Sequence, residues 1–261
     1  MTEAGGTRGP AGKRLLDVAV AVLGLALAAP LLALAALAAR LSSPGPLLYR
    51  ARRVGRGGRP FTMYKLRTMH PAPPGSGSPI TGPADPRVFP AGRLLRLTKV
   101  DELPQLVNVL RGEMSLVGPR PEDPDVVARH YAPLHRETLS VRPGLTSPGT
   151  LYHDIHGDRV LTGGDPETRY AEALLPLKLA LDLVYVRRAS LSYDLAMLWR
   201  TVVTVGGRLL GRRTFPEPPE LSEALALVVP ARSARRTGPM PGRPARPAAG
   251  QPRPAAAGGS P

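Results

Sequence analysis

The sequence predicts a mostly helical α/β fold that associates with a membrane through its N-terminal segment. Three patterns predict this fold. Residues 18–39 form a stretch of 22 positions without a charge. Two short runs within residues 46–69 alternate as strands do, and segments after residue 93 repeat apolar residues at helical spacing. We therefore expect an N-terminal membrane helix and a small cytosolic domain with a short β-hairpin and interfacial helices.

Composition divides the chain into four parts. Residues 1–12 are rich in Gly and Thr and predict a disordered N-terminus. Residues 13–41 are predicted to form the membrane helix, and residues 42–215 the folded domain. Residues 216–261 are rich in Pro, Arg and Ala and predict a disordered tail, within which "ELSEALALVV" is the one short helical pattern.

The membrane helix contains Pro30 near its centre and has cationic residues on both sides. A stretch of 22 apolar residues can cross a hydrocarbon core of about 30 Å. A proline inside a helix removes one backbone hydrogen bond and kinks the helix. Lys and Arg favour the cytoplasmic side, and they occur before and after the segment: Lys13, Arg14, Arg40, Arg50, Arg52, Arg53, Arg56 and Arg59. Two topologies stay open, a kinked spanning helix and a re-entrant helix that returns to the same face.

A β-hairpin is predicted after the membrane helix. The runs "PLLYRAR" and "PFTMYKLRTM" alternate, and the turn "GRGGRP" lies between them. Lys65 and Arg67 flank one leucine, so strand alternation places both side chains on the same side. Residues 71–83 are rich in Pro, Gly and Ser and predict a loop.

A helical pattern extends over residues 93–111 and includes two adjacent carboxylates, Asp101 and Glu102. Proline is tolerated in a first helical turn but not deeper, so Pro104 favours a helix that starts near Asp101. Thr98 is an alternative cap. The apolar face of this helix consists of Leu103, Leu106, Val107 and Leu110. Two further helical patterns cover residues 166–188 and 191–210, and the face with Leu174 and Tyr185 is either core or membrane interface.

The charge balance favours anionic partners. Lys and Arg number 35 against 20 Asp and Glu, a net charge of +15 that attracts phosphorylated substrates, anionic membranes or nucleic acid. Aromatic residues are only 4% of the chain, which argues against stacking on single-stranded nucleic acid. The absence of cysteine excludes disulfides, thiol nucleophiles and cysteine metal sites. An acidic pair between cationic residues is the mixture that phosphoryl transfer needs, because a carboxylate attacks or holds a metal while guanidinium groups bind phosphate oxygens.

Seven segments in order carry a resemblance to a known family. They are "KRLLD" at 13–17, "SPGP" at 43–46, "YKLRTM" at 64–69, "DPR" at 85–87, "DELPQL" at 101–106, "NVLRGEMSLVGPRP" at 108–121 and "RPGLT" at 142–146. Together they resemble the bacterial sugar transferases, the monotopic polyprenol-phosphate phosphoglycosyl transferases. The similarity covers about residues 13–205, with "LDLVYVRRASLSYDLAMLWRTV" as its closing helical segment.

The resemblance implies a function and a location. Such enzymes transfer a sugar-1-phosphate from a UDP-sugar to a polyprenyl phosphate, usually undecaprenyl phosphate, and release UMP. They use Mg²⁺ and start glycoconjugate or exopolysaccharide synthesis at the cytoplasmic face of the bacterial cell membrane. The resemblance also implies the re-entrant topology, with Pro30 at the bend and Asp17 in a structural role at its base. From the residues alone, Asp17 could instead pair with Arg14.

The resemblance further implies roles for individual residues. Asp101 would be the nucleophile that forms a phosphosugar–aspartyl intermediate, and Glu102 would support it, both carboxylates also holding the metal. Phosphate or nucleotide would be bound by Lys65, Arg67, Arg96, Arg120 and Arg142. Asp85 and Arg87 are as consistent with a turn as with the site.

The residues also suggest three other interpretations. The segment "HDIH" at 153–156 could suggest zinc, but its surroundings predict a loop, and phosphate chemistry already calls for Mg²⁺. A membrane-anchored binder of anionic lipid or nucleic acid would explain the charge but not the acidic pair, so we expect no nucleic-acid partner. The third interpretation is a hydrolase that uses Asp101 for the attack of water on a diphosphate. The sequence does not indicate the sugar, the polyprenol length or the oligomeric state.

Overall fold

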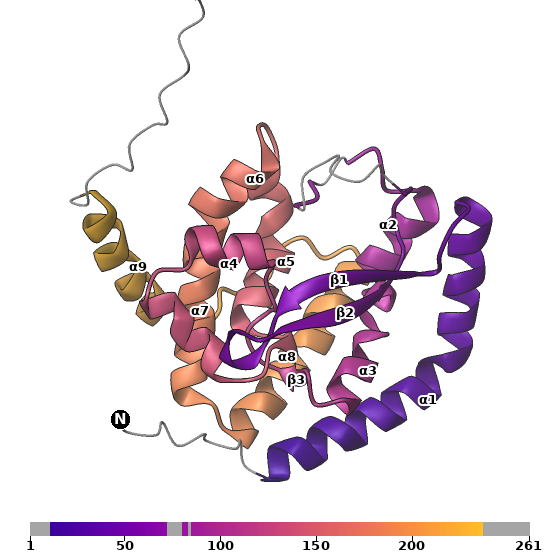
Figure 1. The fold of residues 1–261 in the computed structure, drawn as a ribbon, viewed down its shortest axis with the longest axis horizontal. Helices are drawn as coiled ribbons and strands as arrows, with labels where there is room; N and C mark the ends of the chain where they lie inside the picture. Colours follow the sequence, from indigo (N-terminus) through magenta and orange to yellow (C-terminus); the bar gives the residue numbers. More distant parts are fainter. Residues whose placement is uncertain (1–10, 72–79, 83–84, 237–261) are drawn as a thin grey trace, which may run out of the picture.

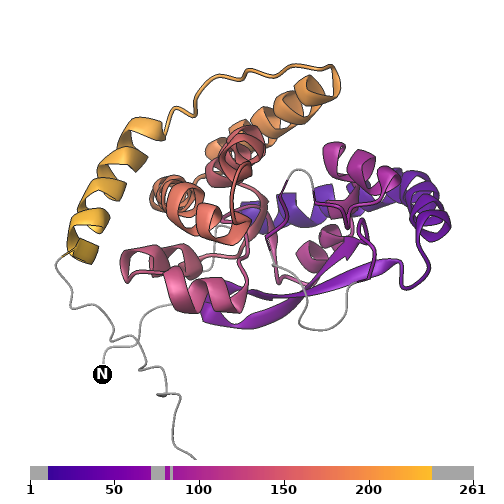
Figure 2. The same ribbon diagram turned by 90° about the horizontal axis from the view of Figure 1, so that it is seen from above.

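The computed structural model describes residues 11–71, 80–82 and 85–236. The polypeptide is mostly helical, with one antiparallel hairpin and one short parallel strand pair. Helix α1 lies at one end of the molecule and helix α9 at the other (Figures 1 and 2). The predicted disordered N-terminus lies outside the described residues except for its last two positions, which belong to α1.

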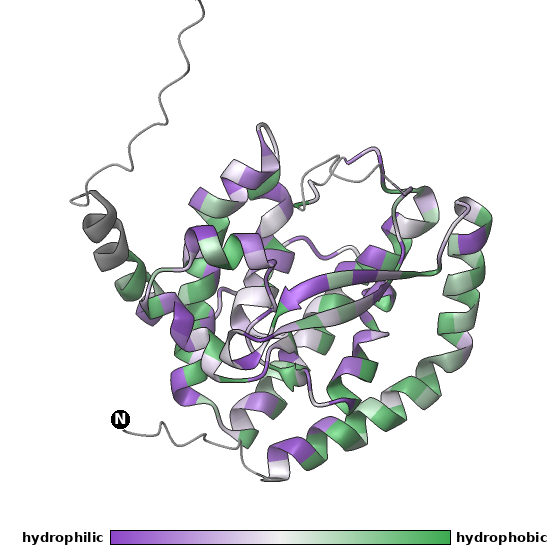
Figure 3. Cartoon of the chain, in the orientation of Figure 1, coloured by the Kyte–Doolittle hydropathy of each residue, from purple (hydrophilic) through white to green (hydrophobic). Residues whose placement is uncertain are grey.

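Helix α1 spans Ala11–Ser42 and is the long apolar helix that the sequence predicts. It is long and apolar enough to cross a membrane, and its ribbon is predominantly hydrophobic in colour (Figure 3). The ribbon changes direction along its length (Figure 1), and Pro30 lies inside the helix. Small residues face the domain: Gly24 is so close to Leu106 that an added Cβ would lie 3.1 Å from it. Large side chains such as Leu27, which is 80% exposed, point away from the domain.

The predicted hairpin is confirmed. Strands β1 (Leu48–Val54) and β2 (Pro60–Leu66) pair in antiparallel register. The turn between them contains Gly57 and Gly58, both with positive φ, a conformation that glycine adopts without the strain of a side chain.

The helical pattern over residues 93–111 is confirmed, and it is divided near Asp101, where Pro104 favours a helix start. The segment forms helix α2 (Pro90–Leu97), a single 3-10 turn η2 (Val100–Glu102) and helix α3 (Gln105–Leu110). Thr98 ends α2 and does not cap the next helix. The break lies at Lys99, whose positive φ ends α2, and Pro104 stands directly before α3, where its missing N–H is tolerated. The acidic pair therefore lies in the turn beside the start of α3, which agrees with the predicted helix start near Asp101.

A second, parallel pair of strands was not predicted. Strand β3 (Ser115–Val117) pairs with β4 (Gly144–Thr146). The pairing depends on the absence of a side chain at Gly144, because an added Cβ would lie 2.2 Å from the backbone nitrogen of Gly118. Asp17 of α1 accepts hydrogen bonds from the Ser115 hydroxyl (3.0 Å) and the Leu116 N–H (2.9 Å). The suggested Asp17–Arg14 pair is thus wrong, because the Asp17 carboxylate instead accepts hydrogen bonds from β3.

The remaining helices form the body of the domain. They are α4 (Pro124–His130), η3 (Leu134–Ser140), α5 (Pro148–Leu161), α6 (Pro166–Arg169), the π-helical turn η4 (Tyr170–Leu174), α7 (Leu175–Arg188), α8 (Leu191–Leu209) and α9 (Leu221–Arg236). The two predicted helical segments are confirmed as α6–α7 and α8. Helix α7 is central, with buried residues on every side, including Leu181 and Val184.

One prediction of irregular structure is wrong. The "HDIH" segment, predicted as a loop, lies inside α5, which begins at Pro148 after the capping side chain of Ser147. The one short helical pattern of the tail, "ELSEALALVV", is confirmed by α9, which continues beyond it to Arg236. Ala224 of α9 is buried against α7, so tertiary packing supplies the stability that composition alone does not show. Residues 237–261 lie outside the described part of the chain.

Candidate active site

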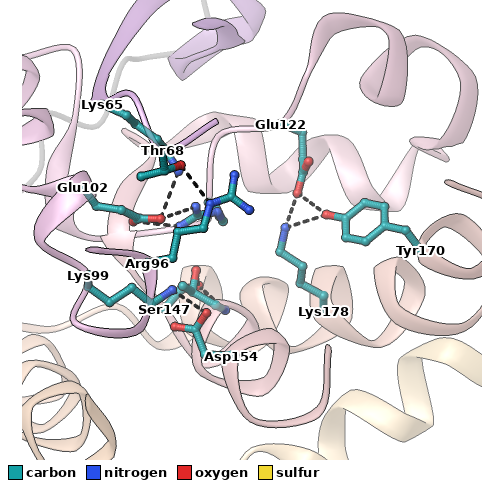
Figure 4. Close-up of polar contacts among 12 residues, drawn as sticks. Lys65, Thr68, Arg96, Lys99, Glu102, Glu122, Ser147, Asp154, Tyr170 and Lys178 are labelled. Carbon is teal, nitrogen blue, oxygen red and sulfur yellow. Dashed lines mark hydrogen bonds and ion pairs between the residues drawn. The ribbon is translucent and has the colours of Figure 1, made fainter. Parts of the chain in front are cut away.

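A large cleft of about 1680 Å³ opens between the hairpin, the η2 turn, the segment before α4 and helix α5. Its described lining contains ten Lys or Arg residues against seven Asp or Glu residues. The excess of positive charge suits an anionic ligand such as a nucleoside diphosphate. Several of the polar side chains that meet there are drawn in Figure 4.

The acidic pair enters the cleft from a strained turn. Lys99, directly before η2, has a φ of 59°, the one positive φ of a non-glycine residue in the described chain. Lysine adopts this left-handed conformation at a cost, and such strain is concentrated at functional sites. The conformation ends α2 abruptly and directs the following residues into the domain. Asp101 is consequently only 6% exposed.

Glu102 is contacted by two cations. Its Oε1 lies 2.9 Å from Lys65 Nζ and 2.7 Å from Arg120 Nη2, and its Oε2 lies 3.2 Å from Arg120 Nη1. Burial alone would raise the pKa of Glu102, but Arg120, Lys65 and Lys99 outweigh burial and hold that pKa well below its usual value. Glu102 is therefore a fixed negative charge at neutral pH.

Asp101 differs from its neighbour in having no such partner. Its buried Oδ1 makes no hydrogen bond with the described residues. Burial, followed by the adjacent negative charge of Glu102, raises the pKa of Asp101 to about 6, and the attraction of Lys65, Lys99 and Arg96 offsets this only in part. A buried polar atom without a partner is uncommon and indicates a group kept ready for a ligand or a reaction. Asp101 is thus ionised at neutral pH but poorly neutralised.

The predicted cations Lys65, Arg96 and Arg120 all meet at the pair. Lys65 reaches Glu102 from β2, and burial lowers its pKa, although the attraction of Glu102 opposes this. Arg96 comes from α2, where its Nε donates to Thr68 Oγ1 at 2.9 Å and its Nη2 contacts Met69 Sδ at 3.1 Å. No carboxylate of the described residues forms an ion pair with Arg96, which leaves its charge available to a phosphate.

Sequence reasoning gave no role to Lys99 or to Asp154. Lys99 Nζ lies 2.6 Å from Asp154 Oδ1 on α5 (Figure 4). This ion pair joins α5 to the turn η2, which carries the acidic pair. His153 of α5 also lines the cleft, and burial, followed by Lys178, lowers its pKa to about 4, so its ring is neutral at pH 7. The adjacency of Lys99 to the pair was a usable signal. The contribution of α5 was not visible, because that segment was predicted to be a loop.

Two predicted phosphate ligands have other partners. Arg67 donates to Ser43 Oγ, Ser43 O and Pro44 O at 2.6–3.0 Å and so fixes the turn after α1. Arg142 donates to Gly112 O at 2.8 Å and does not line the cleft. Asp85 forms an ion pair with Arg87 at 2.6 Å, which agrees with the turn interpretation, although Arg87 also lines the cleft.

The acidic pair fits a magnesium ion that arrives with a substrate. Mg²⁺ is commonly held by one or two carboxylates plus substrate phosphates. The orphaned Oδ1 of Asp101 is a suitable donor, and Glu102 adjoins it. Within residues 11–71, 80–82 and 85–236, no three His, Asp or Glu side chains form a group that could hold a metal ion, those of "HDIH" included. His156 instead contacts Tyr152 and Glu217.

Comparisons with known proteins agree with this chemistry. A family model described as bacterial sugar transferase matches residues 9–208. A UDP-glucose:undecaprenyl-phosphate glucose-1-phosphate transferase of Caulobacter vibrioides is 46% identical over 194 residues, which are 73% of this chain and 68% of that protein. A protein of the same name from Escherichia coli is 36% identical over 73% of this chain and 39% of its own length. A putative undecaprenyl-phosphate N-acetylgalactosaminyl 1-phosphate transferase of Bacillus subtilis is 48% identical over 43% of this chain and 63% of its own length. The chain therefore spans less than two thirds of some relatives.

Proposed function

The chain is an enzyme of the bacterial sugar transferase family, and we propose that it transfers a sugar-1-phosphate from a UDP-sugar to a polyprenyl phosphate with release of UMP. Undecaprenyl phosphate is the expected acceptor, because the curated relatives are named for it. The observation that carries this proposal is the contrast between the two carboxylates: Glu102 is neutralised by cations, whereas Asp101 has a buried oxygen without a partner.

The proposed reaction has two displacements. In the first, the Asp101 carboxylate attacks the β-phosphorus of the UDP-sugar, a phosphorus–oxygen bond to Asp101 forms, and the bond to the UMP oxygen breaks. In the second, an oxygen of the polyprenyl phosphate attacks the same phosphorus, and the bond to Asp101 breaks. A carboxylate nucleophile thus divides one difficult displacement into two easier ones.

The surrounding residues support charge and geometry. Arg96 and Lys65 bind phosphate oxygens, since both lie in the cleft beside Asp101. Arg120 keeps Glu102 ionised and in place. Mg²⁺ bound by Asp101 and Glu102 together with the substrate phosphates would reduce the repulsion between the carboxylate and the phosphates. Arg142 is left out of the proposed site because it does not line the cleft. Arg67 lines the cleft but is left out because Ser43 and Pro44 engage its guanidinium group.

The membrane topology that we propose is re-entrant, with the domain on the cytoplasmic face. Both ends of α1 are bound to the same domain. Near its start, Lys13 Nζ lies 2.6 Å from Asp194 Oδ2, and Arg14 donates to the Val109 and Leu110 carbonyls. Near its end, Ala35 packs against Leu95. If α1 crossed the bilayer, its two ends would lie on opposite sides, and one domain could not contact both. The contacts at both ends therefore support a bend at Pro30.

A second apolar surface supports membrane attachment. Along α8, side chains at helical spacing are exposed, including Leu195 and Trp199, the latter 68% exposed. Exposed apolar stripes with tryptophan are typical of helices that lie in a membrane interface. This face and the exposed leucines of α1 together account for the expected interfacial helices.

One assay tests the proposed function. Purified protein is incubated with Mg²⁺, undecaprenyl phosphate and a panel of UDP-sugars, and UMP and lipid-linked product are measured. We expect UMP release with one or a few of the UDP-sugars. Repeated turnover should require the lipid acceptor. Sustained UMP release that ignores the lipid would indicate a hydrolase. No release with any sugar, together with tight binding of lipid or nucleic acid, would indicate a binder.

A further inference from the structure

At the wall of the cleft lies a buried cluster of one cation, one anion and one phenol. Lys178 of α7, 1% exposed, forms an ion pair with Glu122. Its Nζ donates to the Tyr170 hydroxyl at 2.9 Å, and that hydroxyl donates to Glu122 Oε1 at 2.6 Å (Figure 4). A buried ion pair is seldom more stabilising than apolar residues of the same shape. Stability alone therefore does not account for this cluster.

The cluster holds the segment that carries Arg120. Residues 118–123 connect β3 to α4 and contain Arg120 between two prolines. On one side of Arg120, Pro119 O accepts from Gly144 N at 2.9 Å. On the other side, the Glu122 side chain is held by the cluster, and Glu122 O accepts from Val54 N at 3.0 Å. Arg120 is thus fixed from both directions.

The position of Arg120 determines the orientation and the charge of Glu102 in the acidic pair. Its two guanidinium nitrogens contact the two oxygens of Glu102, a geometry that fixes orientation as well as distance. Tyr170 begins the π-helical turn η4, a rare conformation that is frequent at functional sites. Glu122 and Tyr170 both line the cleft that contains Asp101.

We propose that Glu122, Lys178 and Tyr170 are positioning residues that hold residues 118–123 so that Arg120 meets Glu102 in register. The inference rests on the proposed function, since it concerns the same transfer reaction. The three residues act through Arg120 and do not themselves touch the reacting atoms. Their loss should therefore lower kcat for UMP release more than it changes KM for the UDP-sugar.

The test uses a neutral double variant, Glu122→Gln with Lys178→Met, which leaves no buried charge without a partner. The matched control is Glu220→Gln with Arg200→Met. Arg200 Nη1 lies 2.8 Å from Glu220 Oε1, and the Tyr193 hydroxyl donates to Glu220, so this triad has the same chemistry, but none of its members lines the cleft. Thermal unfolding confirms that each variant folds. If the double variant does not fold, Tyr170→Phe replaces it and Tyr193→Phe is its control.

We expect the cluster variant to lower kcat about tenfold and the control to change it less than threefold. In an Arg120→Lys background, which lacks the two-point contact, the cluster variant should lower kcat less than threefold, because coupled residues are not additive. A cluster variant equal to its control, or a tenfold loss that persists unchanged in the Arg120→Lys background, would overturn the positioning role alone. A wild-type protein that releases no UMP from any UDP-sugar would overturn the proposed function and this inference with it.

Discussion

At the residue scale, the site depends on two adjacent carboxylates in different electrical surroundings. Glu102 has both oxygens on cations, and Asp101 has a buried oxygen with no partner. The sequence was sufficient to predict that the pair lies together with three cations, Lys65, Arg96 and Arg120. It could not separate these from Arg67, because alternation gives the side of a strand and not the distance to a ligand.

Replacement of Asp101 by Asn should abolish transfer without loss of the fold. Asparagine is nearly isosteric but does not attack phosphorus as a carboxylate does, so turnover should fall roughly 1000-fold or more. UMP release measures the loss. Asp165→Asn is the control: Asp165 is an exposed helix cap, and asparagine caps equally well. Turnover in Asp101→Asn within tenfold of wild type would contradict the covalent route.

Asp101→Asn should be more stable than wild type at alkaline pH. The pKa of Asp101 is raised to about 6 from 3.8, so the folded state holds its proton more tightly than the unfolded state. Stability contributed by this group is therefore lost as the pH rises from about 4 through 6. At pH 8 Asp101→Asn removes that cost, and its melting temperature should exceed that of wild type by a few degrees. At pH 4 the difference should vanish, and an equal difference at both pH values would refute this assignment.

Activity should fall below about pH 6. The nucleophile must be ionised, and the raised pKa of Asp101 places half-ionisation near pH 6. For the substrate-free enzyme, kcat/KM for the UDP-sugar should decrease about tenfold per pH unit on the acid side. The measurement is the initial rate of UMP release between pH 4.5 and 8 at constant ionic strength. A rate that stays constant down to pH 4.5 would show that Asp101 titrates lower or is not the nucleophile.

At the element scale, local signals located the hairpin, the long apolar helix and the helices α6–α8, whereas tertiary contacts decided the strand pair β3–β4 and the full length of α9. The turn glycines fixed the hairpin, because Gly57 and Gly58 adopt positive φ. The helix predicted across the acidic pair is interrupted, since Lys99 takes a left-handed conformation that no propensity scale assigns to lysine. Helix α9 depends on its contact with α7, which composition does not reveal.

Asn108 illustrates a structural residue inside a matched motif. Its Nδ2 donates to Thr62 O at 2.7 Å, and its Oδ1 accepts from Tyr64 N at 3.2 Å, so α3 is tied to β2. Asn108→Ala should lower the free energy of unfolding by roughly 1–3 kcal/mol, because buried backbone groups lose their partners. Denaturant unfolding in detergent measures it. Arg111→Ala, at an exposed contact on the same helix, should change that free energy by less than about 0.5 kcal/mol; similar losses in both would contradict the argument.

At the scale of the whole molecule, the domain binds both ends of one apolar helix, and this arrangement defines the predicted topology. Because the chain has no cysteine, single cysteines at Arg8 and Arg59 can be labelled by a membrane-impermeant thiol reagent. In intact spheroplasts both positions should be protected, and in lysed spheroplasts both should react. Pro30→Leu, which restores the missing helical hydrogen bond, should expose the Arg8 position to the outside. Labelling of one position alone in the wild-type background would establish a spanning helix.

The covalent step is tested most directly by mass. The protein is mixed with Mg²⁺ and a UDP-sugar that supports turnover, without lipid acceptor, quenched in acid and digested. The peptide that contains Asp101 should carry the added mass of one sugar-phosphate, and the modification should disappear when polyprenyl phosphate is added before the quench. An unmodified peptide, under conditions where the complete mixture forms lipid-linked product, would contradict the account.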